Sequence, residues 1–266
     1  MLVSPRFSWL VAGLIMVIGT GTPTSANWEE TPPSGVRHFF RDRNIGVAFN
    51  SLSATQWGAT FTTGAKVAFF ARRDQSGPRL MFFSTEKLRE RDPLVVGRFN
   101  QFAGTRVLGG YEWHREGFVF SAYGGASLVM HSPWERAVTR YHARIGVAGG
   151  LEFWKNWQAG AAMPEGFSSG TWMFDAAERS LFLRLRHGIA TGFHGIAIGP
   201  DVSISTGNRI VVGRLVARES WLKTRIGLHA TGFRFGQLGL NISAGYEHRN
   251  RERGGGYAEA TMLWYY

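Results

Sequence analysis

The sequence predicts an all-β protein, an antiparallel transmembrane β-barrel, and three observations support this fold class. Segments of about ten residues alternate between apolar and polar side chains, most clearly in the last 70 residues. The N-terminus has the pattern of an export signal. The composition combines 35 glycines and 14% aromatic residues with no cysteine. Glycine eases wall curvature, and aromatic side chains suit the membrane interfaces.

The alternation is strictest near the C-terminus. Between Gly195 and Ser205, Ile196, Ile198, Val202 and Ile204 share one parity with Pro200, while small or polar residues fill the other. The pattern returns in 238–249 and again in 258–266. A two-residue period places alternate side chains on opposite faces of a strand. These segments are therefore predicted to be strands with one lipid-facing side.

The N-terminus predicts export. Arg6 precedes an apolar run over 7–19, and Thr24, Ser25 and Ala26 supply small residues for cleavage. Thirteen apolar residues are few for a membrane anchor, which is the alternative. We expect a signal peptide over 1–26, a flexible lead-in over 27–43 and a barrel over 44–266. Export together with alternating strands predicts the outer membrane of a Gram-negative bacterium.

Charge and composition limit the kinds of partner and cofactor that this chain is expected to bind. The formal net charge is +11, which in a soluble protein would raise the question of nucleic acid. For an exported chain we expect no nucleic acid, and we expect the basic side chains to meet anionic lipid phosphates instead. The absence of cysteine excludes disulfides and thiolate chemistry. There is no phosphate loop, dinucleotide fingerprint or zinc-like histidine spacing, so neither cofactor nor metal is expected.

Twelve strands are expected, with ten or fourteen as alternatives, because bacterial single-chain barrels close with even numbers. The early candidates are 44–53, 57–71 and 79–85, followed by a charged loop over 86–98. Alternation is clear again around 107–113, 118–130 and 145–153. The stretch 156–177 contains two glycine-rich breaks and is expected to be one hairpin or a long loop. The later strands include 181–185 and 226–230, with Leu181, Leu183 and Leu185 expected to face lipid.

The polar parity collects charges of both signs, which are expected to line the barrel lumen. The candidates are Arg106, Glu112, Arg144, Glu152, Arg184, Arg186, Asp201, Arg225, Glu247 and Arg249, with Glu259 on the same parity. Such side chains could neutralise one another or could line a path for a polar solute. We favour the structural interpretation. Pro200 lacks an N–H, so the sequence Gly199-Pro200-Asp201 predicts a local irregularity of the wall more readily than a binding carboxylate.

Catalytic patterns are weak, and no catalytic residue is assigned. A Ser–His pair could support acyl hydrolysis at the membrane. Ser203 or Ser243 with His229 is the least implausible pair, although a chain with so many serines offers such pairs by chance. We therefore expect a protein that is not an enzyme.

Five short motifs give the chain a family resemblance. They are Gly109-Gly110-Tyr111-Glu112-Trp113, Ile198-Gly199-Pro200-Asp201, Arg225-Ile226-Gly227-Leu228-His229, Ser243-Ala244-Gly245-Tyr246 and Gly255-Gly256-Tyr257-Ala258. In this order and spacing, over 109–266, the chain resembles the bacterial cellulose biosynthesis protein BcsS family. Those proteins are exported and encoded with cellulose synthase components, and the family offers no catalytic residues to carry over.

The resemblance implies a function that the composition alone does not. It implies a non-enzymatic outer-membrane barrel that assists cellulose biosynthesis, export or anchoring. Its partners would be outer-membrane lipid, cellulose, and cellulose synthase or export components. Two alternatives stay open: a lipid-modifying hydrolase with a Ser–His site, and a structural barrel unrelated to polysaccharide.

Overall fold

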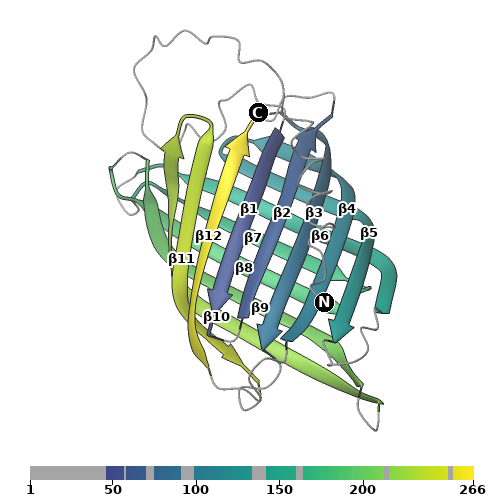
Figure 1. The fold of residues 1–266 in the computed structure, drawn as a ribbon. Coiled ribbons are helices and arrows are strands. Elements are labelled where there is room, and N and C mark those ends of the chain that lie inside the picture. Colours follow the sequence, from purple (N-terminus) through teal and green to yellow (C-terminus); the bar gives the residue numbers. More distant parts are fainter. Residues whose placement is uncertain are drawn as a thin grey trace.

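A computed structural model describes residues 46–56, 58–69, 75–90, 99–133, 142–159, 164–193, 195–212, 216–250 and 254–266. The expected signal peptide and lead-in lie outside these residues. Twelve antiparallel strands form a closed barrel (Figure 1). They are β1 (Gly46–Thr55), β2 (Gly58–Ala68), β3 (Gly77–Glu90), β4 (Phe99–Arg115), β5 (Phe118–Pro133), β6 (His142–Trp157), β7 (Gly166–Asp175), β8 (Ser180–Ala190), β9 (Ala197–Val212), β10 (Val216–Phe235), β11 (Leu238–Arg249) and β12 (Gly255–Tyr265).

The sheet closes where β1 meets β12. Each strand pairs with its neighbours in sequence, and the last ladder joins Val47 to Tyr265 and Thr55 to Tyr257. A closed sheet has no free edge at this seam, so backbone donors and acceptors find partners inside the wall, as lipid requires. The start of β1 and the end of β12 lie at one end of the barrel, called here the terminal end; the opposite end is the far end (Figure 1).

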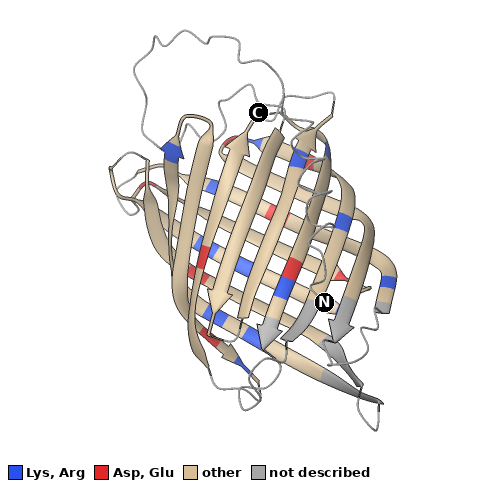
Figure 2. Cartoon of the chain, in the orientation of Figure 1, with Lys and Arg blue, Asp and Glu red and all other residues tan. Residues whose placement is uncertain are grey.

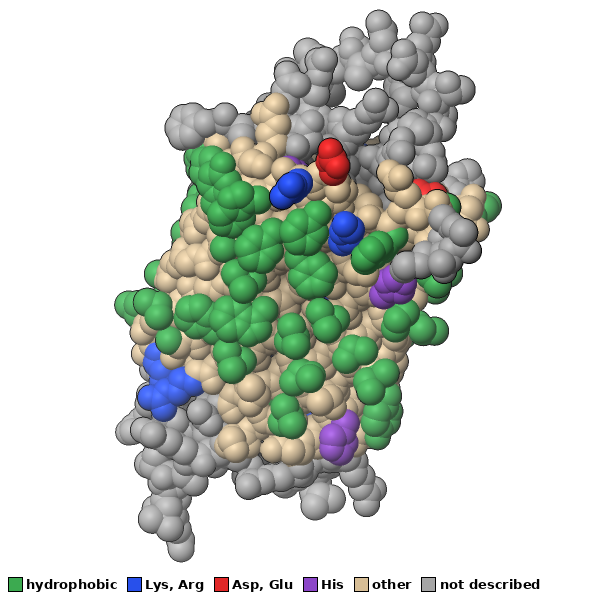
Figure 3. Space-filling model, turned by 180° about the vertical axis from the view of Figure 1, so that it is seen from behind, with side chains coloured by type: hydrophobic (Ala, Val, Ile, Leu, Met, Phe, Trp, Pro, Cys, Tyr) green, Lys and Arg blue, Asp and Glu red, His purple; other side chains and the backbone are tan. Residues whose placement is uncertain are grey.

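The outer face of the wall is apolar. Leu181, Leu183 and Leu185 project outward from β8, and Ile145 on β6 is 82% exposed. Hydrophobic side chains cover the face seen in Figure 3. The described residues contain no helix of the length and apolarity that a membrane crossing requires. Exposed apolar side chains thus lie on the outside of the barrel, a distribution typical of outer-membrane barrels.

The structure confirms the fold class and the twelve-strand count but corrects two boundaries. The charged loop expected over 86–98 begins too early, because β3 continues to Glu90. Its charges fit a strand, since Lys87 shares the inner face with Thr85 through the pleat. The stretch 156–177 contains a full strand, β7, in spite of Ser168-Ser169-Gly170. Gly170 fits there because the ring of Phe153 on β6 occupies the space of a side chain.

The expected irregularity at Pro200 is confined to one ladder. On the β8 side, pairing stops after Arg186↔Asp201 and resumes at Ile189↔Ile198, without a change of register. On the β10 side, Pro200 keeps its place opposite Leu228. Proline offers no N–H to the β8 ladder, and the missing pairs lie where that donor would be.

Apolar side chains fill the middle of the lumen. Met81, Phe83, Leu108, Tyr123 and Ala148, from β3 to β6, form one buried cluster, and the side chain of Leu108 is wholly buried. Phe49 on β1 and Met173 on β7 pack against the same cluster. Five strands lie between β1 and β7 in either direction around the closed sheet, so these contacts join opposite sides of the wall. The barrel has a core of its own.

The facing of β8 can be tested with one substitution. Leu183→Arg puts a charge on the apolar outer face near the middle of the strand, which costs about 2–4 kcal/mol at the bilayer midplane. We expect a loss of folded protein in lipid, seen as loss of the gel-mobility difference between unheated and boiled samples. Leu183→Ala is the control, because it removes apolar contact without adding charge. Equal folding of the two variants would contradict this facing.

Candidate functional site

Charged side chains gather inside the barrel in three clusters. Figure 2 shows Lys and Arg beside Asp and Glu along the strands. The terminal cluster is Lys66, Arg79, Glu112, His114 and Glu152; the seam cluster is Arg184, Arg186, Asp201, Arg225, Glu247, Arg249 and Glu259; the turn cluster is Lys87, Arg106, Asp175 and Glu178. The inner parity of the strands positions most of these side chains, whereas Glu178 comes from a turn.

Glu112 on β4 is the centre of the terminal cluster. Its carboxylate lies 2.5 Å from Nζ of Lys66 and 3.1 Å from Nε of Arg79. It also accepts a hydrogen bond of 2.9 Å from the hydroxyl of Ser121 and lies 2.8 Å from Nε2 of His114. Lys66 reaches across the lumen to Glu152 at 3.1 Å. Every oxygen of a buried carboxylate is thereby satisfied, which its burial requires.

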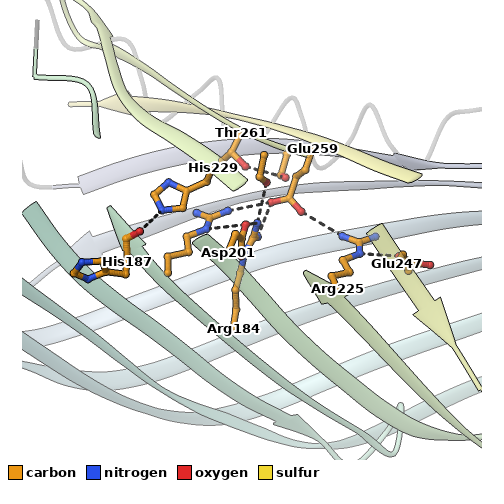
Figure 4. Close-up of polar contacts among 11 residues, drawn as sticks. Arg184, His187, Asp201, Arg225, His229, Glu247, Glu259 and Thr261 are labelled. Carbon is orange, nitrogen blue, oxygen red and sulfur yellow. Dashed lines mark hydrogen bonds and ion pairs between the residues drawn. The ribbon is translucent and has the colours of Figure 1, made fainter. Parts of the chain in front are cut away.

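Two carboxylates organise the terminal side of the seam cluster (Figure 4). Asp201 on β9 accepts Nε of Arg184 at 2.9 Å and Nε of Arg186 at 3.2 Å. Glu259 on β12 accepts the same Arg184 at 2.6 Å and Arg225 at 3.4 Å. Arg184 lies on β8, so these bonds connect β8 both to its neighbour β9 and to the more distant strand β12.

The seam cluster continues toward the far end around Glu247. This carboxylate lies 2.7 Å from Nε of Arg225 and 2.5 Å from Nε of Arg249. Lys223 stands directly opposite Arg249 in the β10–β11 ladder, on the inner face. Three cations therefore surround one carboxylate at this point.

The turn cluster surrounds the link between β7 and β8, residues 176–179. This link bends into the lumen and is called here the inward turn. The side chain of Ala177 is 3% exposed and packs with Phe102 and Val129 on the inner faces of β4 and β5. Gly146 on β6 makes room for it, because a Cβ there would lie 2.5 Å from the backbone nitrogen of Ala177. The amide of Ala176 donates to the carbonyl of Val147 at 2.8 Å.

Ion pairs fix this inward turn. Glu178 accepts Nζ of Lys87 at 2.5 Å and a guanidinium nitrogen of Arg106 at 2.8 Å. Nε of Arg106 also donates to Asp175 at 2.6 Å. Burial opposes ionisation of Glu178, but Lys87 and Arg106 outweigh it and lower its pKa to about 2. The carboxylate therefore stays charged at neutral pH.

The ten lumen candidates from the sequence divide among these clusters with one exception. The register puts all ten on the inner face. Arg144, at the far end of β6, has no ion-pair partner among the described residues. Sequence reasoning missed Lys66, Arg79, Lys87, Asp175 and Glu178 among the clustered charges. Lys66 and Arg79 lie where alternation is weak, and Lys87 lies in the stretch expected to be a loop. Asp175 and Glu178 lie at a turn that the pattern left without an assignment.

The Ser–His pairs considered from the sequence do not form. Nε2 of His229 contacts the carbonyl of His187 at 3.3 Å, and its Nδ1 is buried without a partner among the described residues. Ser243 accepts a hydrogen bond from Arg184 instead. No group of three potential metal ligands occurs in the described part of the chain.

A different serine and histidine meet on the outer face near the terminal end. The hydroxyl of Ser168 on β7 lies 2.9 Å from Nδ1 of His187 on β8. Nε1 of Trp157 donates to the same hydroxyl at 2.9 Å. These hydrogen bonds give the polar groups of the three side chains partners on a lipid-facing surface, where water is absent.

The family model for cellulose biosynthesis protein BcsS matches residues 47–265. The chain belongs to the BcsS family. The match spans the barrel from β1 to β12, a longer part than the motifs in 109–266 covered. No curated protein sequence matches the chain significantly. Among solved structures, the β-domain of the Bordetella autotransporter BrkA is similar to it, with 13% identity and a TM-score of 0.42 over 85% of this chain and 100% of that one.

The inward turn predicts that Gly146 tolerates no side chain. Gly146→Ala should lower the free energy of unfolding by about 1–3 kcal/mol, because the added methyl group meets the backbone of the turn. Gly124→Ala on β5 is the matched control, since a Cβ there meets nothing within 4 Å. Urea titration of the two variants in detergent measures the difference. Equal stability would show that the turn does not lie on Gly146.

Proposed function

We propose that this BcsS-family barrel is a non-enzymatic outer-membrane scaffold that anchors cellulose-producing or cellulose-exporting machinery. Family membership supports the link to cellulose biosynthesis. The observation that favours a scaffold over a conduit is the filled interior of the barrel. The apolar outer face supports residence in lipid.

A conduit would need a continuous hydrated path, and the described interior opposes one. The apolar cluster crosses the lumen from β1 to β7. On either side of it, Lys66–Glu152 and Arg106–Asp175 join strands that are not neighbours. Most inner charges are thus committed to one another, and a glucan chain would have to displace both core and ion pairs.

Deletion of the gene tests the cellulose role. We expect extracellular cellulose to fall or to lose its attachment to the cell, because the anchor is missing. Synthase activity in isolated inner membranes should stay unchanged, since the barrel takes no part in glucan synthesis. Normal, normally attached cellulose in the deletion strain would refute the proposal.

Conductance separates the scaffold from a conduit. The purified full chain in planar lipid bilayers should show no steady open-pore current, because the apolar cluster closes the lumen. A barrel of known porin type, reconstituted in the same way, is the control. Long-lived open steps for this chain would favour a conduit.

The pair of Ser168 and His187 supports a second candidate function, hydrolysis of a lipid ester. A hydroxyl hydrogen-bonded to an imidazole is the first requirement of an acyl-transfer nucleophile. Among the described residues no carboxylate orients this imidazole, so the function ranks second. If it holds, Ser168→Ala should abolish fatty-acid release from phospholipid vesicles while Ser203→Ala leaves it intact. Absence of release by the unaltered protein removes this candidate.

A further inference from the structure

We propose that the far end of the lumen is a binding site for a phosphate group. The site is a basic basin formed by Lys87, Arg144, Lys223, Arg225 and Arg249, on the inner faces of β3, β6, β10 and β11. No scaffold function requires this site, and the inference does not rest on the cellulose role.

The charge balance of the basin differs from that of the other clusters. Its five cations face the carboxylates of Glu178, Glu247 and Glu259, of which Glu178 is shared with Arg106 and Glu259 with Arg184. The terminal cluster, by contrast, sets Lys66 and Arg79 against Glu112 and Glu152. An uncompensated cation in a confined, partly dry space is costly, and a bound anion would compensate it.

Lys223 is the clearest sign of a missing anion. It stands directly opposite Arg249 across the β10–β11 ladder, and like charges in that position repel. The one carboxylate beside them, Glu247, is held by Arg225 at 2.7 Å and Arg249 at 2.5 Å. Lys223 has no ion-pair partner among the described residues.

The chemistry of these side chains favours phosphate. Guanidinium groups bind phosphate oxygens with paired N–H donors, and an ammonium adds a compact charge. A phosphate monoester carries a charge of about −1.5 to −2 at neutral pH, so one bound group would offset much of the excess positive charge in the basin. The side chain of Lys87 is 38% exposed, so the basin is accessible to a ligand. The inward turn, with Ala177 against Phe102 and Val129, bounds it on the side of the lumen core.

Thermal unfolding of the full chain in a neutral detergent tests the site. Inorganic phosphate should raise the midpoint relative to chloride at equal ionic strength, because a ligand that binds the folded state stabilises it. Lys223→Gln should weaken phosphate binding about tenfold, the value of one charge-assisted hydrogen bond. Without phosphate this variant should be at least as stable as the unaltered protein, since it relieves the repulsion with Arg249.

Lys155→Gln is the matched control, because it removes one cation from the outer face near the terminal end, beside Trp157. It should keep the full response to phosphate. Nanodiscs of phosphatidylcholine with and without lipopolysaccharide identify the source of the group. Stabilisation by inorganic phosphate would identify the ligand as a free phosphate. Stabilisation by lipopolysaccharide alone would identify it as a lipid headgroup, provided that Lys223→Gln abolishes that stabilisation. No response to either, or equal losses in the two variants, overturns the inference.

Discussion

The pairing of β1 with β12 is the constraint on which the rest of the structure depends. Once this ladder forms, the wall has no edge at the seam, and apolar side chains can cover its outside. The period of two then sends the alternate residues inward, charges included. An inner face shared by twelve strands cannot be solvated as a surface is, so each carboxylate must find its cations inside the lumen, on its own strand, on an adjacent strand or across the barrel. Closure of the sheet therefore requires that the charges on its inner face neutralise one another.

Buried ion pairs of this kind contribute more to specificity than to stability. Removing two charges from water costs about as much as their attraction returns. Breaking a single pair, however, leaves a buried charge alone, and that is expensive. Asp201 and Glu259 each hold arginines from other strands, so a slip of β8 or β9 by one residue would break several bonds at once. The seam cluster thus fixes register where Pro200 weakens the ladder.

Much of this fold could be predicted from the sequence because a strand's facing is a local property. Leu181, Leu183 and Leu185 alternate with arginines, and no distant information is needed to orient them. The partners of those arginines are different. Lys66 and Glu152 are 86 positions apart, and only the stagger accumulated around the closed sheet brings them together. The inward turn was also beyond local patterns, because its reason, the bare backbone at Gly146, lies on another strand.

The stretch that formed β7 shows a related limit. Ser168, Ser169 and Gly170 read as a break because small polar residues favour turns. In the barrel, the ring of Phe153 supplies the volume that Gly170 lacks, so the strand is completed by its neighbour. A glycine in this wall can therefore mark a close contact between strands and not an interruption.

The core that joins β1 to β7 has a mechanical consequence. A hollow cylinder of twelve strands can flatten at little cost, because bending its wall strains few hydrogen bonds. Here Phe49 and Met173 press on the same cluster from opposite sides, and Arg184 connects β8 to Glu259 on β12. These contacts act as internal struts. The cross-section therefore resists collapse under a sideways load.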